Sequence, residues 1–553
     1  MKNLTLLLLL LVFSFTSFAQ VNQSAEKWQE DLQFLQHTVH KDYDFLFKKV
    51  SQRDFDAAVK NLYSEIPTME EHEIIVGFSR IISMFGYGHT SLWLYPRGEH
   101  GKFNFHQVPF NMMAFSDGIY LQGVHKDYYN GLGAQVLEVE GMPVKEALKR
   151  VKPVFPAEND QFFKAYGLNY LGIPEILHAQ KITKELKPEV TLTLKKDGLT
   201  FRQTYKAAKI DKFPGHYGYV FKDDNWLSAR EEGDLPLYLT DLEKIYFFEY
   251  LPEHKTVYVR QSQIQDDPSE AIPEFYGRVF KFIEENDVEK LVIDVRLNGG
   301  GNNYKNKPVV KGVIRSDKIN HPGKFFVITG RRTFSACQNL VNELSNYTEV
   351  TFVGEPTGEN INFYGDVNNV DLPNSGITVR LSFAWWQDKP QWEGGPWTAP
   401  HLAVEMSFDE YKNNQDPVLQ TALDFSADNF ILDPMQYFTD LYMAGDTEKM
   451  QSEALRMIND PVYKFFDFEG EFNTAGYRLL NSGQIEPAVQ VFGFVTQLFP
   501  DSANAWDSLA EGMWKAGNIE QAKALYQKAI SMDPDGKVGE NARNMLKKIE
   551  GKE

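Results

Sequence analysis

Apolar residues recur at helical spacing in the first part of the chain. Ser24 is placed to cap a helix whose apolar residues share one face: Trp28, Leu32, Leu35 and Val39. Thr68 and Glu71 form the pattern of a capping box for a later helix with its own apolar stripe: Ile74, Phe78, Ile81 and Phe85. The pattern predicts a small helical unit at about residues 21–87. Gly86 and Gly88 follow it and permit a sharp turn.

From about residue 105 to 208 the pattern changes to short strand-like runs separated by turn signals. We expect strands at residues 108–115, 118–124 and 190–194. Residues 134–144 predict a strand, a turn and the start of a helix that ends near Val151. This order resembles the second half of a PDZ domain, interrupted by residues 153–185.

Between about residues 243 and 425, apolar runs rich in β-branched residues alternate with helical ones. Strands are predicted at residues 256–260, 291–295, 325–329 and 350–353, and helices at 272–286 and 336–345. Alternation of this kind predicts a partly parallel sheet covered by helices.

The C-terminal part contains an internal repeat of 34 residues, which is the tetratricopeptide length. Five pairs of similar residues follow this period: Phe472 and Trp506, Gly483 and Gly517, Ala488 and Ala522, Phe492 and Tyr526, Pro500 and Pro534. We interpret the repeat as two stacked helical hairpins at about 471–538, which serve as a protein-partner surface or as a packing cap.

Composition and charge narrow the classes of function. The 553 residues suffice for several domains, and the net charge of −19 argues against a nucleic-acid partner. Lys2, an apolar run at residues 6–15 and Ser17-Phe18-Ala19 are typical of a secretory signal cleaved before Gln20. The run is too short to span a bilayer, so we expect an exported periplasmic or extracellular protein without a transmembrane segment.

The most informative motif is a buried strand that leads directly into three glycines, Gly299, Gly300 and Gly301. Glycines leave backbone N–H groups unshielded, as the binding of a developing oxyanion requires. A phosphate-binding loop is disfavoured, because neither Lys-Ser nor Lys-Thr follows and no GxGxxG spacing exists. A purely structural loop remains the alternative.

Two further motifs follow in the same segment. Ser335 and Ala336 open the helix that comes after the strand at 325–329, where the helix dipole favours negative charge. A serine here is also the ordinary N-cap residue. The loop 354–358, with the sequence GEPTG, follows the next strand.

In combination, these motifs resemble the tail-specific (C-terminal processing) serine peptidases, over about residues 21–425. The resemblance implies a multidomain α+β protein with a crotonase-like αβ catalytic core. It implies that Ser335 is the nucleophile, and that Ala336 and one of Gly299 or Gly300 supply the oxyanion hole. Neither a metal nor an organic cofactor is expected.

The general base is the point at which branches of this family differ. The lysine of the bacterial processing members would fall at Asn360, whose amide cannot accept a proton, so a Ser–Lys dyad at this position is excluded. The tricorn-like branch places a histidine after the helical cap, and His89 resembles it; an imidazole with a pKa near 6.5 suits this role. The family pattern has a serine where this chain has Gly88. A purely structural role for His89 is the alternative.

The acidic residue that orients the base corresponds to Glu393 in the same comparison, with Glu355 as the alternative. Cys337 offers a thiol two residues after Ser335, but residues i and i+2 of a helix point in different directions. Four tryptophans lie near Glu393, where they line a substrate cleft or pack a long loop: Trp385, Trp386, Trp392 and Trp397.

The sequence therefore predicts an exported serine-type endopeptidase that cleaves peptide or protein substrates through an acyl-enzyme. Its expected organisation is a signal peptide (1–19), a helical cap with the histidine loop (20–100), a PDZ-like domain that holds a peptide (101–210), the peptidase core (211–430) and a helical region (431–553). The alternative is a catalytically inactive relative that binds peptides or hydrophobic ligands. A carbohydrate-active protein that uses the tryptophans is disfavoured, because no paired carboxylates accompany them.

Overall fold

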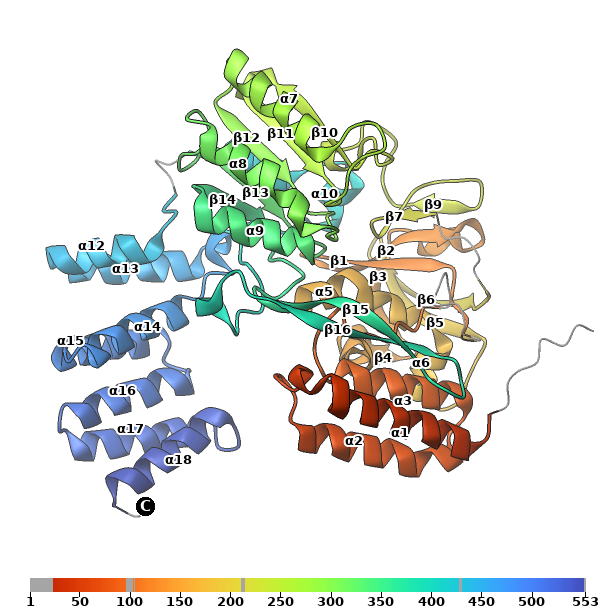
Figure 1. Ribbon diagram of the computed structural model, residues 1–553, viewed down its shortest axis with the longest axis horizontal. Helices are drawn as coiled ribbons and strands as arrows, with labels where there is room; N and C mark the ends of the chain where they lie inside the picture. Colours follow the sequence, from red (N-terminus) through yellow and green to blue (C-terminus); the bar gives the residue numbers. More distant parts are fainter. Residues whose placement is uncertain (1–22, 96–102, 104, 210–213, 427–429, 552–553) are drawn as a thin grey trace, which may run out of the picture. The chain divides into compact units, whose positions relative to one another are not determined.

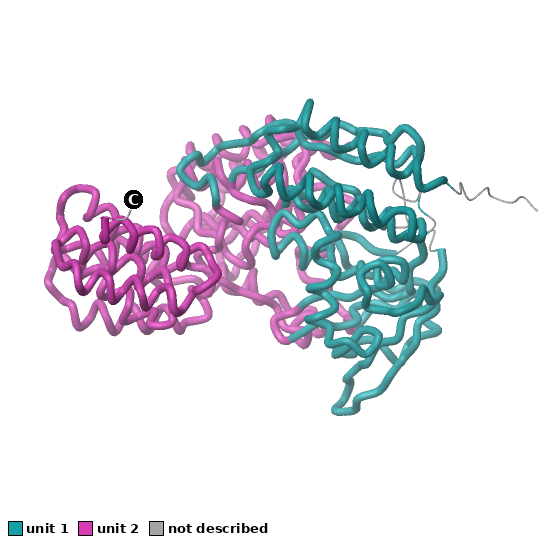
Figure 2. Tube along the Cα trace, turned by 90° about the horizontal axis from the view of Figure 1, so that it is seen from below, with its two compact units in different colours: residues 1–114, 118–229, 362–394 teal, residues 115–117, 230–361, 395–553 magenta. Residues whose placement is uncertain are grey.

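The computed structural model describes residues 23–95, 103, 105–209, 214–426 and 430–551 (Figure 1). The predicted signal peptide lies outside these residues. The chain divides into two compact units (Figure 2). Unit 1 is Met1–Ala114, Gly118–Ala229 and Asn362–Gly394, and unit 2 is Phe115–Asp117, Arg230–Ile361 and Gly395–Glu553. Among the described residues, every helix is too short or too polar to cross a membrane.

Unit 1 begins with three helices, α1 (Ala25–Asp42), α2 (Gln52–Glu65) and α3 (Glu71–Ser83). The apolar stripes predicted for the first and third helices are buried. The capping box predicted at Thr68 is wrong, because residues 66–68 form a separate 3₁₀ turn. The N-cap of α3 is instead Glu70, whose backbone N–H donates to Glu73 Oε2 at 3.1 Å.

The sheet of unit 1 has the strand order β1-β2-β3-β5-β6. Its strands are β1 (Phe110–Phe115), β2 (Gly118–His125), β3 (Gln135–Val139), β5 (Glu189–Lys196) and β6 (Leu199–Lys206). The short strand β4 (Met142–Pro143) pairs with β3, and β9 (Trp226–Ser228) pairs with β2. A separate two-stranded sheet is formed by β7 (Gly215–His216) and β8 (Tyr219–Val220). Three helices accompany the sheet: α4 (Val144–Val151), α5 (Asp160–Tyr166) and α6 (Pro174–Ala179). The predicted strands are confirmed; the PDZ-like assignment stays a prediction.

A long antiparallel hairpin completes unit 1, although it comes late in the sequence. It consists of β15 (Phe363–Asp371) and β16 (Thr378–Trp386). Its tip is fixed to α1, because the backbone N–H groups of Asn374 and Ser375 both donate to the carboxylate of Asp31 at 2.8 Å. The hairpin thereby packs with the N-terminal helices.

Unit 2 contains a six-stranded sheet in the order β10-β11-β12-β13-β14-β17, parallel except for the edge strand β10. The strands are β10 (Tyr246–Leu251), β11 (Thr256–Gln261), β12 (Lys290–Asp294), β13 (Phe325–Thr329), β14 (Val350–Gly354) and β17 (Leu402–Ala403). The prediction of a partly parallel sheet is confirmed by the parallel pairing of β11 to β14 and β17. One α-helix follows each of β11, β12 and β13 in the sequence and connects it to the next parallel strand.

Helices cover both faces of this sheet (Figure 1). Phe325 and Val327 point to α7 (Ile272–Glu285), α8 (Lys307–Arg315) and α9 (Ala336–Tyr347). Phe326 and Ile328 point to the opposite face, where they pack against α11 (Pro417–Leu423). The short helix α10 (Phe408–Lys412) precedes α11 in the sequence. Since successive side chains of a strand alternate between faces, a continuous apolar run is what a doubly covered strand needs.

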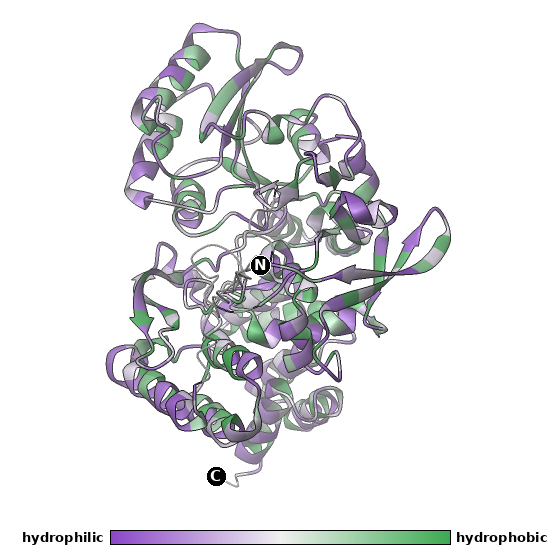
Figure 3. Cartoon of the chain, turned by 90° about the vertical axis from the view of Figure 1, so that its right-hand side faces the viewer, coloured by the Kyte–Doolittle hydropathy of each residue, from purple (hydrophilic) through white to green (hydrophobic). Residues whose placement is uncertain are grey.

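The C-terminal part of unit 2 is entirely helical. It comprises α12 (Pro434–Ala444), α13 (Thr447–Asn459), α14 (Phe468–Asn481), α15 (Ile485–Leu498), α16 (Ala503–Lys515), α17 (Ile519–Met532) and α18 (Lys537–Ile549). Hydrophilic and hydrophobic residues alternate along helices of the chain, as in amphipathic helices (Figure 3). Residues 34 positions apart take equivalent places: Gly483 and Gly517 turn with φ of 81° and 83°, and Ala488 and Ala522 are buried. Their assignment as tetratricopeptide repeats stays a prediction.

Candidate active site

A buried ion network supports the start of the glycine loop in unit 2. Arg296 follows β12 and contacts Asp294 at 2.8 Å and both oxygens of Asp416 at 2.9 and 3.0 Å. Tyr258 donates its hydroxyl to Asp294 at 2.9 Å. Burial raises the pKa of Asp294, and the nearby guanidinium opposes that rise. The network therefore fixes the strand end from which the loop departs.

The glycine loop lies directly against the predicted nucleophile. Gly300 has φ of 101°, and a Cβ atom there would lie 2.6 Å from the Cβ of Ser335 and 2.9 Å from the backbone nitrogen of Ala336. Only glycine fits such an approach. The Gly300 N–H donates to Asn298 Oδ1 at 2.9 Å, whereas Gly299 is exposed. Of the two glycines, Gly300 therefore has its N–H engaged within the loop, while Gly299 lies at the surface.

Ser335 stands immediately before α9 in a rare backbone conformation, with φ of 54° and ψ of −129°. A conformation of this kind costs about 1–3 kcal/mol in a residue other than glycine and is concentrated at functional sites. Its side chain makes no capping hydrogen bond to the helix. Ser335 therefore does not act as an ordinary N-cap, whose side chain would accept a backbone N–H of the helix.

Residues 354–361 clamp the turn that carries Ser335. Arg331 forms two hydrogen bonds with Glu355, at 2.6 and 2.8 Å, and the Gly358 N–H donates to the Thr333 carbonyl oxygen at 3.0 Å. The backbone N–H of Ser335 donates to Glu359 Oε2 at 3.1 Å. Glu355 thus has a structural partner within unit 2, while Glu359 was not singled out by the sequence.

Cys337 is fully buried in the core between the sheet and α9. Burial raises the pKa of its thiol well above the ordinary value. The thiol is therefore protonated at neutral pH, as expected for a small core residue rather than a nucleophile.

The loop that carries His89 belongs to unit 1, where it is fixed to β16. Ser91 exchanges two backbone hydrogen bonds with Arg380, at 2.9 and 3.0 Å, and the Ser382 N–H donates to Thr90 Oγ1 at 3.2 Å. The His89 ring stacks on Phe363 with 6.1 Å between the ring centroids. The late hairpin therefore positions the early histidine loop.

The electrostatic environment of His89 differs from the sequence-based expectation. Burial, reinforced by the positive charge of Arg380, lowers the pKa of His89 to about 4. The pKa near 6.5 that was expected for His89 is therefore wrong, because burial of the ring was not foreseen. The imidazole is neutral at pH 7 and has a nitrogen lone pair that can accept a proton.

Two carboxylates lie in the part of unit 1 that holds the histidine loop. Glu393, predicted to orient the base, has a 58 % exposed side chain and pairs with Lys48 at 2.8 Å. Glu158 has a fully buried side chain and accepts the backbone N–H of Gly88 at 2.6 Å. Glu158 is not predicted from the sequence, because nothing in its local sequence marks it.

The tryptophans beside Glu393 are partly explained by packing. Trp385 lies 4.7 Å from the ring of Tyr364, and the Lys48 ammonium lies 4.1 Å from the Trp385 ring centroid. Trp386 donates to Asp366 at 3.2 Å. Trp392 is 46 % exposed, and Trp397 is half-buried.

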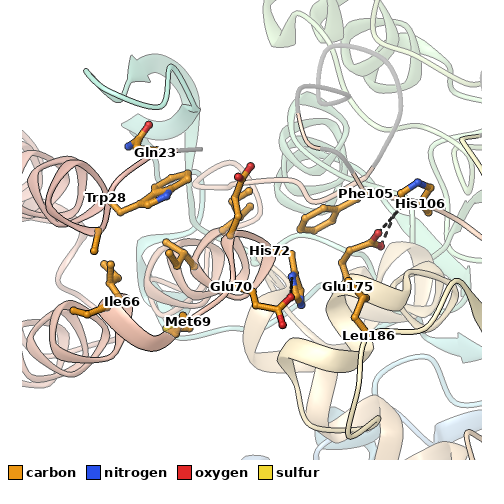
Figure 4. A pocket seen from close by; sticks show the side chains of 15 residues that line it. Gln23, Trp28, Ile66, Met69, Glu70, His72, Phe105, His106, Glu175 and Leu186 are labelled. Carbon is orange, nitrogen blue, oxygen red and sulfur yellow. Dashed lines mark hydrogen bonds and ion pairs between the residues drawn. The ribbon is translucent and has the colours of Figure 1, made fainter. Parts of the chain in front are cut away.

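A separate pocket of about 520 Å³ opens between α1, α3 and the region of α6 in unit 1 (Figure 4). His106 Nδ1 lies within hydrogen-bonding distance of Glu175 Oε1, at 2.7 Å. His72, at its base, is within 2.8 Å of His178. None of the predicted catalytic residues lines this pocket.

Comparisons with known proteins agree with this architecture. No protein-family model and no curated protein matches the sequence. The structure of mature CPAF complexed with lactacystin matches with a TM-score of 0.50 at 15 % identity, over 72 % of this chain and 98 % of that chain. CPAF is a tail-specific serine peptidase. This chain has the fold of that class.

Two more distant matches are the photosystem II D1 C-terminal processing protease and the tricorn protease. Each has a TM-score of 0.32, at 14 % and 13 % identity. The matches cover 68 % and 72 % of this chain, and 92 % and 36 % of the respective proteases. The resemblance to tail-specific peptidases, expected from the motifs, is thus confirmed at the level of the fold by the CPAF match.

Proposed function

We propose that this protein is an exported serine endopeptidase, with Ser335 as nucleophile and His89 as general base. The observation that carries the proposal is the strained turn at Ser335, which lies at a helix N-terminus against the Gly300 backbone.

The chemistry follows from these groups. Ser335 Oγ attacks the peptide carbonyl carbon while its proton passes to the neutral His89 imidazole. The imidazolium then donates that proton to the leaving amine, the C–N bond breaks, and water hydrolyses the resulting ester. The N–H groups of Gly299 and Ala336 bind the oxyanion, because the Gly300 N–H is engaged by Asn298.

The residue that orients His89 is assigned within the same proposal. Glu393 is the acid expected from the resemblance, and its exposure allows its side chain to leave Lys48 when substrate binds. Glu158 acts instead through the backbone of the histidine loop. We propose that the PDZ-like sheet holds the substrate peptide by strand addition, and that the helical repeats bind a protein partner.

Labelling with a fluorophosphonate probe tests this assignment. We expect a covalent adduct on the peptide that contains Ser335, and its loss in both Ser335→Ala and His89→Ala. Cys337→Ala is the matched control, since it removes the one thiol of the chain and should retain labelling. Absence of labelling in the folded wild type would favour the alternative, a catalytically inactive peptide-binding relative.

A further inference from the structure

The backbone of Ser335 requires an external restraint. Its φ of 54° is unfavourable for a residue with a side chain, and its N–H precedes a helix and has no partner within that helix. The residue before it is held by the glycine loop, because the Phe334 N–H donates to the Asn298 carbonyl oxygen at 3.1 Å. The N–H of Ser335 itself is held by a side chain from another loop, Glu359.

Glu359 is a fully buried carboxylate, which is costly unless the charge is compensated. The Ser335 N–H and the positive end of α9 provide such compensation. The loop of Glu359 is also fixed. Thr357 exchanges two hydrogen bonds with Thr398, at 3.0 and 3.2 Å, and its hydroxyl donates to the Glu359 carbonyl oxygen at 3.2 Å.

We propose that Glu359 is a positioning residue that holds the turn of Ser335 in its strained conformation and so aims the hydroxyl at the substrate carbonyl. This inference rests on the proposed peptidase function. Glu359 acts through the backbone of Ser335 and takes no proton from it. Loss of this restraint lets the turn relax, and a displacement of about 1 Å at a reacting atom costs on the order of 100-fold in rate.

The test measures the rate and affinity of fluorophosphonate inactivation separately. Glu359→Ala should lower the maximal inactivation rate about 10- to 100-fold with little change in the affinity for the probe. Glu359→Gln keeps an acceptor oxygen and should stay within about threefold of wild type. A residue that only stabilises the fold would not give this split between rate and affinity, nor this rescue by glutamine.

Glu355→Gln is the matched control, because it weakens the Arg331 pair in the same loop without touching the Ser335 N–H. It should lower the melting temperature but leave the inactivation rate closer to wild type than Glu359→Ala does. If the alanine variant does not fold, Glu359→Asp should show an intermediate rate, because its carboxylate is shorter by one methylene.

Hydrogen exchange of the Ser335 amide provides a readout that is independent of activity. Exchange should accelerate at least tenfold in Glu359→Ala and remain slow in Glu359→Gln. Inactivation of the alanine variant at the wild-type rate overturns this inference alone. Failure of the wild type to react overturns the proposed function, and the positioning role with it.

Discussion

The depressed pKa of His89 leads to a prediction about the pH dependence of activity. With a pKa of about 4, the imidazole of the folded protein is neutral and able to accept a proton throughout the range from pH 5 to 8. The rate of fluorophosphonate inactivation should therefore have its acid limb near pH 4. An ordinary histidine would place that limb near pH 6.5.

The same shift predicts an effect on stability, whose sign follows from proton linkage. Between pH 6.5 and 4 the unfolded chain binds a proton at His89 that the folded chain excludes, so stability falls as the pH decreases through this window. The difference between the two pKa values corresponds to about 3 kcal/mol, or on the order of 300-fold in the folding equilibrium. Below pH 4 both states are protonated, and the loss reaches its full size.

The assay is urea unfolding of the wild type and of His89→Gln at a series of pH values. The variant lacks the titrating group, so the wild type should lose up to about 3 kcal/mol relative to it between pH 6.5 and 4. His37→Gln, at an exposed position of α1, serves as the surface control. A stability difference between wild type and His89→Gln that stays constant across this range, or an activity limb near pH 6.5, would refute the reasoning.

Three further predictions concern the supports of the site. Gly300→Ala should lower the free energy of unfolding by about 2–4 kcal/mol, since its Cβ would meet backbone atoms at 2.8 and 2.9 Å, whereas Gly299→Ala meets nothing within 4 Å and should unfold like wild type. Glu158→Ala should cost about 1–3 kcal/mol in urea unfolding and slow fluorophosphonate labelling, and Glu158→Gln should restore both, because it can still accept the Gly88 N–H. Arg296→Ala should cost about 3–5 kcal/mol by leaving two buried carboxylates unpaired, and a loss below about 1 kcal/mol would contradict this account.

The peptidase core was the part of the fold that could be predicted best from the sequence. The strand predicted at residues 325–329 has these bounds in the structure, since its uninterrupted apolar run is needed by a strand covered on both faces. The start of α3 was predicted two residues too early, with Thr68 rather than Glu70 as its N-cap. Pro67 and Thr68 belong to a 3₁₀ turn, and the signal of Thr68 and Glu71 did not distinguish that turn from the helix.

The candidate site also contains residues that could be predicted from the sequence and residues that could not. The motifs around Ser335 and the glycine loop lie within short stretches of sequence, so their chemistry was visible there. Glu359 and Glu158 were not, because they act on backbone groups 24 and 70 residues away. Almost every residue carries a backbone N–H, so the residue type of the donor does not indicate that such a hydrogen bond exists. The pKa of His89 escaped prediction for a related reason, since burial depends on the tertiary packing of its loop.

Glu158 and Glu359 perform the same physical task on the two loops that carry the predicted catalytic residues. Each is buried, and each accepts the backbone N–H of a residue in the loop. Because Glu359 accepts the backbone N–H of Ser335, this restraint remains when the Ser335 hydroxyl is removed. A comparison of Ser335→Ala with the wild type therefore reports on that hydroxyl alone, whereas a comparison of Glu359→Ala with Glu359→Gln reports on how accurately the turn holds it.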